Sequence, residues 1–312
     1  MNSAKKICVP VLALCIVSIT LATKYAGDFE ELGTSARAIG MGGCVVASAT
    51  GPAAIYYNPA MAGRAKHTRA LFLHSEDFSG LVHHNFLGVS FPSGLQSYGL
   101  GLLHNGIPGI KLTKLKYPDK PGPNDSNPPV IDRVVSVNQF VGYINYARAI
   151  SPHVAFGGNT KIIYQDLGVG SCFGMGIDFG LALTPGADID VGLRVRNAST
   201  SPLFWTTGTR ELILPRVALG FSKTFRFGKN AIGLAFEAEA NSEESDLFQS
   251  FGVEYSFRKV LFVRLGTLRN NFTFGLGGRY KRFYIDYGYT SGYMPGAHGL
   301  GSAQQVSGGV EF

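Results

Sequence analysis

Histidine and serine side chains are where metal binding or nucleophilic catalysis would have to begin in this sequence. His83 and His84 are adjacent, so in an extended segment they point to opposite faces and do not share a metal ion. The remaining histidines lack carboxylates or cysteines at metal-ligand spacing: His67, His74, His104, His153 and His298. Ser151 and Ser201 precede prolines in predicted turns, without the nucleophile-elbow pattern. These residues predict structural roles and no metal site.

Two glycine-rich stretches resemble phosphate-binding loops only in their glycines. GVGSCFGMG at 168–176 and GLGGRYK at 275–281 open no predicted helix, and no Gly-Lys-Ser/Thr follows either. We therefore predict that the chain is not an enzyme and that it uses no cofactor.

A period of two runs from Arg69 to the last residue. In residues 172–184, large apolar side chains occupy every second position, and glycine, alanine or aspartate stands between them. Fourteen such segments are predicted, near 69–76, 82–91, 97–105, 134–148, 153–165, 172–184, 187–197, 212–225, 230–240, 246–257, 260–269, 271–280, 282–290 and 303–312. No apolar run among them reaches the length of a membrane helix.

The connections between these segments alternate in length. Short turns occur near 92–96, 149–152, 185–186, 226–229, 258–259 and 281, and long connections at 106–133, 198–211 and 291–302. A transmembrane barrel has short periplasmic turns and long outer loops. Together with the terminal Phe312, this favours an all-β, transmembrane antiparallel β-barrel of about 14 strands over 68–312. A soluble secreted β-protein is the alternative.

Charged residues of such a barrel must point into the lumen, because a charge facing lipid near the midplane costs roughly 2–4 kcal/mol. The segments place these inward: Lys161, Asp178, Asp190, Arg194, Arg196, Glu237, Glu239, Glu254, Arg264 and Arg279. The net charge of +7 is scattered, with no run of five cations. It predicts no nucleic-acid partner.

The N-terminus resembles a secretory signal peptide. Two lysines precede an apolar run that ends in Thr20-Leu21-Ala22, and we predict that residues 1–22 are removed. Acylation at Cys15 is a minor alternative, because the bulky Leu14 precedes it. Removal leaves Cys44 and Cys172, which either form one disulfide or remain two buried thiols.

Residues 33–63 read GTSARAIGMGGCVVASATGPAAIYYNPAMAG and follow neither a helical nor a strand period. The glycines allow close approach of backbone to a wall, and Asn58-Pro59 initiates a turn. Such a segment is either an ordinary glycine-rich loop or a plug that folds against something else.

GTSARAIGMGG at 33–43 and AIYYNPA at 54–60 resemble the N-terminal segment of FadL-like outer-membrane proteins, a group that includes long-chain fatty acid transporters and PorV-type secretion proteins with spirochaetal relatives. The resemblance covers about thirty residues closely, and the acidic pair often found before AIYYNPA is replaced by CVVASATGPA. It implies that residues 23–67 form a hatch inside the barrel. The implied hatch residues are Gly40, Gly42, Gly43, Asn58, Pro59 and Ala60.

The resemblance implies a bacterial outer-membrane channel that takes up long-chain fatty acids or other hydrophobic small molecules when the hatch moves. Lumen cations would meet the carboxylate, and apolar loop residues would bind the ligand outside. The predicted ligand residues are Arg37, Arg194, Arg196, Arg264, Phe204, Trp205 and Leu112. For each arginine, a salt bridge to a lumen carboxylate is the alternative role. Membrane lipids and the barrel assembly machinery are the other expected partners.

Two other functions remain open. A non-transporting scaffold would bind protein partners through its loops, and a general porin would conduct ions without movement of the hatch.

Overall fold

The computed structural model describes residues 26–78, 80–242, 247–292 and 302–312. The predicted signal peptide, residues 1–22, lies outside them. Among the described residues, no helix is both long and apolar enough to cross a membrane. The short helices are η1 (Asp28–Glu30), α1 (Ala36–Gly40), α2 (Ala53–Tyr57) and η2 (Pro59–Arg64).

Strands make up most of the chain. They are β1 (Arg69–Asp77), β2 (Val82–Ser93), β3 (Gln96–Leu115), β4 (Pro129–Ser151), β5 (Val154–Asp166), β6 (Ser171–Gly186), β7 (Ile189–Arg196), β8 (Ser201–Trp205), β9 (Arg210–Ile213), β10 (Arg216–Phe227), β11 (Asn230–Asn241), β12 (Leu247–Phe257), β13 (Leu261–Leu268), β14 (Asn271–Tyr280), β15 (Phe283–Thr290) and β16 (Ala303–Glu311).

Fourteen of these strands close into an antiparallel barrel. Neighbours in the chain pair along β1–β7 and β10–β16, β7 pairs with β10, and β1 pairs with β16. The ring is complete because β5 also pairs with β6. Closure leaves no sheet edge in hydrocarbon. The predicted transmembrane barrel of about 14 strands is confirmed.

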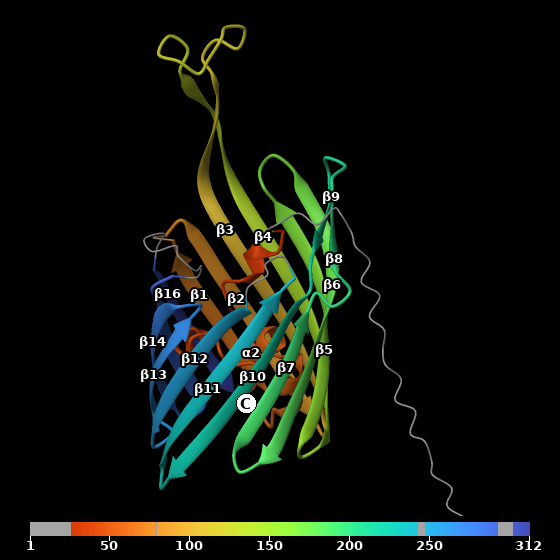
Figure 1. The fold of residues 1–312 in the computed structure, drawn as a ribbon, viewed down its shortest axis with the longest axis vertical. Coiled ribbons are helices and arrows are strands. Elements are labelled where there is room, and N and C mark those ends of the chain that lie inside the picture. The colour runs from red at the N-terminus through yellow and green to blue at the C-terminus, as the bar shows by residue number, and fades with distance from the viewer. Residues whose placement is uncertain (1–25, 79, 243–246, 293–301) are drawn as a thin grey trace, which may run out of the picture.

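The two ends of the barrel differ, as expected. At the end drawn lowest in Figure 1, called the lower end here, strands are joined by two or three residues, at 94–95, 152–153, 187–188, 228–229, 258–260 and 281–282. The upper end carries the longer connections, apart from the two-residue turn at 269–270 between β13 and β14. Short turns face the periplasm in outer-membrane barrels. The fold thereby sets the direction of the chain across the membrane.

Two predicted long loops contain more strand than expected. The prediction of a loop over 106–133 was wrong for most of its length, because β3 and β4 continue beyond the barrel as a projecting two-stranded hairpin (Figure 1). Pro108 and Gly109 favoured a loop in the sequence, whereas a register shift between Ile107 and Ile110 accommodates them within the ladder. The second loop, 198–211, contains β8 and the first half of β9, which pair with each other and, through β8, with β6.

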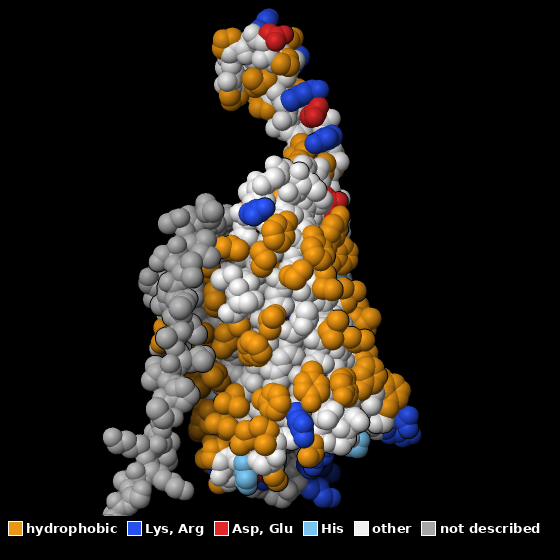
Figure 2. All heavy atoms as spheres, turned by 90° about the vertical axis from the view of Figure 1, so that its right-hand side faces the viewer, with side chains coloured by type: hydrophobic (Ala, Val, Ile, Leu, Met, Phe, Trp, Pro, Cys, Tyr) orange, Lys and Arg blue, Asp and Glu red, His pale blue; other side chains and the backbone are white. Residues whose placement is uncertain are grey.

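The outer surface is apolar, as the alternation predicted. Side chains such as Phe173, Phe179 and Phe251 are about half exposed, and Figure 2 shows hydrophobic side chains distributed over the barrel wall. The positions between them are lumen-facing. Asp178, Lys161 and other predicted inward charges are buried inside.

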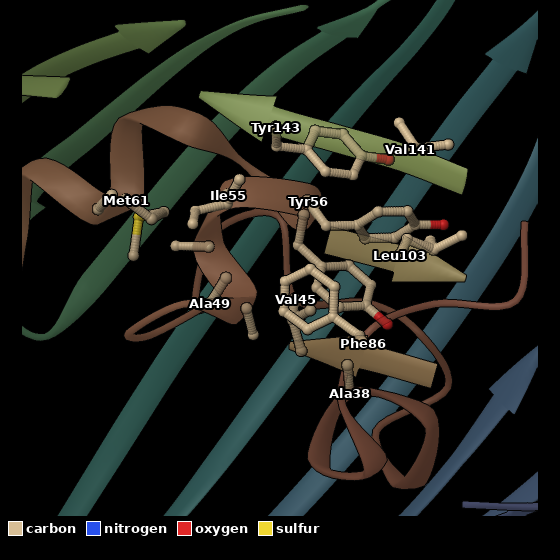
Figure 3. Packing of buried hydrophobic residues seen from close by; sticks show 14 of the residues in the cluster. Ala38, Val45, Ala49, Ile55, Tyr56, Met61, Phe86, Leu103, Val141 and Tyr143 are labelled. Carbon is tan, nitrogen blue, oxygen red and sulfur yellow. The ribbon is translucent and has the colours of Figure 1, made fainter. Parts of the chain in front are cut away.

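Residues 26–68, called the N-terminal segment here, lie against the inner wall. Helix α1 packs on β13–β16, and η2 packs on β2–β6. Figure 1 shows α2 within the outline of the barrel, and Figure 3 shows Tyr56 beside Phe86, Leu103 and Tyr143 of the wall. The main hydrophobic core therefore forms between this segment and the strands.

Candidate functional site

Glycines of the inner wall are in close contact with the backbone of the N-terminal segment. A Cβ added to Gly192 of β7 would lie 2.3 Å from the carbonyl oxygen of Val46. The corresponding distances are 2.3 Å from Gly252 to the Met41 oxygen and 2.4 Å from Gly288 to the Ala36 oxygen. A ring of wall glycines has such contacts: Gly157, Gly180, Gly192, Gly252, Gly266, Gly275 and Gly288. This explains why small residues alternate with apolar ones along the strands.

We expect Gly192→Ala to weaken docking of the N-terminal segment by roughly 1–3 kcal/mol, the usual cost of overpacking. The new methyl group would clash with the Val46 carbonyl, and neither partner is a flexible side-chain end. Gly142→Ala is the matched control, because its nearest neighbour would be 4.0 Å away. Alkylation of buried Cys44 measures docking. Equal rates in the two variants would contradict this account of the glycines.

The predicted hatch residues occupy this contact zone. Gly42 and Gly43 have φ of 68° and 75°, a conformation that favours glycine. Gly40 meets Gly275 backbone to backbone. The Asn58 side chain donates to the carbonyls of Val46 (2.8 Å) and Leu181 (3.2 Å). Its side-chain oxygen accepts a hydrogen bond from the Ala60 amide (3.1 Å). Asn58 thereby caps the start of η2, which begins at Pro59.

Glu31 joins the N-terminal segment to three arginines of the wall. Its carboxylate lies 2.6 Å from Arg216, 2.6 Å from Arg269 and 3.5 Å from Arg196. Burial raises the pKa of this carboxyl, but the three arginines outweigh burial and lower it from 4.5 to about 2. Glu31 is therefore ionised at neutral pH and holds the segment to three strands or turns at once.

Two further sets of salt bridges attach the N-terminal segment to the wall. Glu30 meets fully buried Lys161 at 2.9 Å, and Lys161 also contacts Asp178 at 3.2 Å. Arg64, near the lower end, binds Asp190 at 2.7 Å. Ion pairs thus fasten the segment to different sides of the barrel.

The four predicted carboxylate-binding arginines all have protein partners. Arg37 binds Glu254 (2.9 Å), and Arg264 binds both Glu254 (2.6 Å) and Asp286 (2.7 Å). Arg194 binds Glu239 and lies 3.6 Å from Glu237, while Arg196 is held by Glu31. The salt-bridge alternative therefore describes their resting state, and the ligand role stays a prediction.

Two cavities adjoin these groups. One of about 60 Å³ lies between the segment and β7, β11, β12 and β13, lined by Tyr56, Tyr57, Arg194, Arg196, Glu239 and Arg269 among others. A larger one of about 260 Å³ opens near the lower end, where Arg69 begins β1 and Glu311 ends β16. Each is bounded by both the N-terminal segment and the wall.

The three apolar ligand residues predicted from the sequence do not come together. Leu112 is half-buried on the projecting part of β3, opposite Arg133 of β4. Phe204 of β8 pairs with the lipid-facing Phe173 and is 47% exposed, so it shares the outer face. Trp205 points the other way and packs against the hydrophobic core. Of the three, Trp205 alone is directed to the interior.

Sequence reasoning missed the residues that hold the start of the segment. The ring nitrogens of buried His84 lie 2.5 Å from the Gly33 carbonyl oxygen and 2.5 Å from Asn105 Oδ1. Asn105 Nδ2 in turn donates to the Phe29 carbonyl (2.7 Å). The strand alternation could have placed both side chains in the lumen, but it could not have paired them with residues 29 and 33.

Cys44 and Cys172 are both buried and unpaired. Of the two alternatives left open by the sequence, two free thiols is the one observed. Burial raises the pKa of the Cys44 thiol well above its usual range, so this thiol is protected while the segment is docked.

Solved structures of similar fold include a transporter, a channel and a FadL homologue. The toluene transporter TodX of Pseudomonas putida is 12% identical, with a TM-score of 0.57 over 90% of this chain and 98% of that one. The monoaromatic hydrocarbon channel CymD is 11% identical (TM-score 0.55; 90% and 98%). A FadL homologue of Pseudomonas aeruginosa is 10% identical (TM-score 0.53; 89% and 98%). No family model and no curated protein matches. The chain therefore has the fold of the FadL-type outer-membrane barrels, which confirms at the level of fold the resemblance seen in residues 33–60.

Proposed function

We propose that this protein is a channel of the bacterial outer membrane for hydrophobic small molecules, with long-chain fatty acids as its substrate class and the N-terminal segment as its gate. The observation that carries the proposal is the contact between the backbone of that segment and the wall glycines on β5–β7 and β12–β15. Where these contacts close the lumen, a solute can pass only if the N-terminal segment moves or if the solute leaves laterally through the barrel wall.

The projecting hairpin supports an apolar entry route. Ile107 pairs with Val137, and Ile110 pairs with Val135, just above the lumen. Because Asn105 is lumen-facing, Ile107 continues the same face of β3 upward. These pairs give a hydrophobic molecule an apolar surface before it reaches the charged interior.

Arg194 and Arg196 are the best-placed partners for a fatty acid carboxylate. Both line the cavity of about 60 Å³. Both also keep a buried Nε–H without an acceptor in the described part of the chain. An incoming carboxylate would satisfy these donors by exchange with Glu239 or Glu31. The cavity must enlarge for this, which links binding to movement of the segment.

Uptake by liposomes carrying the purified protein tests the function. We expect protein-dependent uptake of radiolabelled oleate and, with Arg194→Gln and Glu239→Gln combined, at least about a tenfold loss, the cost of one good charge-assisted contact. The paired substitution keeps the net charge of the lumen unchanged and leaves Arg269 with Glu31, while Glu237 loses its contact with Arg194 and keeps the hydrogen bond from the Val46 amide. Labelled toluene is the comparison, because a neutral solute does not need the arginine. Uptake of toluene alone would overturn the fatty acid assignment, and uptake of neither would overturn the channel.

One observation favours a scaffold as the second candidate. Beyond Gly106, β3 has no partner on its β2 side, and before Asn138, β4 has none on its β5 side among the described residues. A two-stranded hairpin standing free above the membrane suits contact with another protein. The scaffold function would be favoured if the protein took up neither solute and bound a partner protein, and if removal of residues 110–134 abolished that protein binding.

A further inference from the structure

Exposed cations are most numerous on one half of the lower rim, and on the opposite half exposed Arg148 lies near the end of β4. Three neighbouring turns, β10–β11, β12–β13 and β14–β15, and the end of β10 carry these exposed side chains: Arg226, Lys229, Arg258, Lys259, Lys281 and Arg282. We call this set the basic arc. The turns of the other half contain no Lys or Arg and read Gly94-Leu95, Pro152-His153 and Ala187-Asp188.

The charge of the arc is largely uncompensated. Arg226 pairs with Asp188, while the other five have no salt-bridge partner among the described residues. Arg258, Lys259 and Lys281 also have φ of 52°, 59° and 55°, a region that glycine and asparagine adopt at lower cost. The backbone conformation of these turns therefore does not account for the presence of Lys and Arg at these positions.

The arc lies at the depth of lipid head groups. Arg258 stands over the ring of the preceding Phe257 at 5.1 Å, and Lys281 over Tyr280 at 5.3 Å. Phe257, Tyr280 and Phe283 are exposed on the lipid-facing side. Aromatic rings at the end of the apolar band mark the membrane interface. Cations one or two residues further on therefore reach the phosphate layer.

We propose that the basic arc binds the head groups of anionic phospholipids in the membrane leaflet at the short-turn end. Anionic lipids attract basic residues near the surface, and each such residue contributes roughly fivefold to binding. An acidic protein would also meet the charge, but the exposed rings beside the cations lie in the lipid-facing band and favour lipid. The arc concentrates this binding on the β10–β15 side.

Lipid selectivity of the intact protein in vesicles tests the proposal. Spin-labelled phosphatidylglycerol and phosphatidylcholine are compared for the fraction immobilised on the barrel. We expect phosphatidylglycerol to be preferred, and the preference to fall at least about fivefold when Lys229, Arg258, Lys259, Lys281 and Arg282 are all changed to Gln. In the unaltered protein, about 1 M salt should also weaken it, because screening then acts within roughly 3 Å.

The projecting hairpin provides a control of equal charge. Changing Lys111, Lys114, Lys116, Lys120 and Arg133 to Gln removes the same five charges at the other end of the molecule. We expect this variant to keep the preference of the unaltered protein. An equal loss in both variants would reduce the effect to net charge and overturn the assignment to the arc. A preference unchanged by salt and by the arc substitutions would overturn the binding itself.

Discussion

Deletion of residues 33–63 is expected to raise single-channel conductance at least about tenfold, because a barrel of this size encloses an aqueous lumen once nothing fills it. In the intact protein those residues contact wall glycines on several sides, and helices α1 and η2 lie across the interior. The deletion also removes Arg37, whose loss leaves Glu254 with Arg264 as partner. The wall strands keep their own ladder of hydrogen bonds, so the barrel should still form.

Planar-bilayer recording of the intact and shortened proteins is the measurement. Removal of residues 117–127 at the tip of the β3–β4 hairpin is the control, since that loop lies outside the lumen. It should leave conductance unchanged. A general porin would conduct equally before and after removal of 33–63, and this result would overturn the gate.

The fold could be predicted from the sequence because every strand faces two different solvents. Lipid selects large apolar side chains on one face, and the lumen accepts glycine or charge on the other, so a period of two persists through all fourteen barrel strands. Segment 271–280 has the same bounds in β14, and 282–290 is one residue longer than β15. The strands whose bounds differ most from the predicted segments are β3 and β4. Above the membrane their outer faces no longer need apolar side chains, and Pro108 obscured the alternation there.

The partners inside the lumen could not be predicted in the same way. Alternation places Glu254 and Arg264 inward, but the ion pair of Glu254 with Arg37 joins residues that are 217 positions apart. Such pairing depends on how the N-terminal segment enters the barrel, which no local pattern encodes. Glu30 and Glu31 show this most clearly, since neither was selected as a functional residue.

Glu31→Ala is the second change with a large expected effect. It removes one carboxylate from Arg196, Arg216 and Arg269, each of which is at least half-buried. Loss of one partner from a buried ion cluster costs about 3–5 kcal/mol, because the remaining charges stay desolvated. The barrel ladder is untouched, so the cost falls on docking of the N-terminal segment. We expect Cys44 to react with 4,4′-dithiodipyridine about a hundredfold faster or more.

The pH dependence of this difference identifies Glu31 as its source. In the docked state the pKa of its carboxyl is about 2, against an ordinary value of 4.5. A lowered pKa stabilises docking fully above pH 4.5, and the contribution is lost as the pH falls from 4.5 toward 2. Cys44 of the unaltered protein should therefore approach the reactivity of Glu31→Ala only near pH 2. Glu76→Ala, which removes an exposed carboxylate on β1, should react like the unaltered protein throughout. Equal rates for Glu31→Ala and Glu76→Ala at pH 7 would show that this ion cluster does not hold the segment, and the wall glycines would then have to account for docking by themselves.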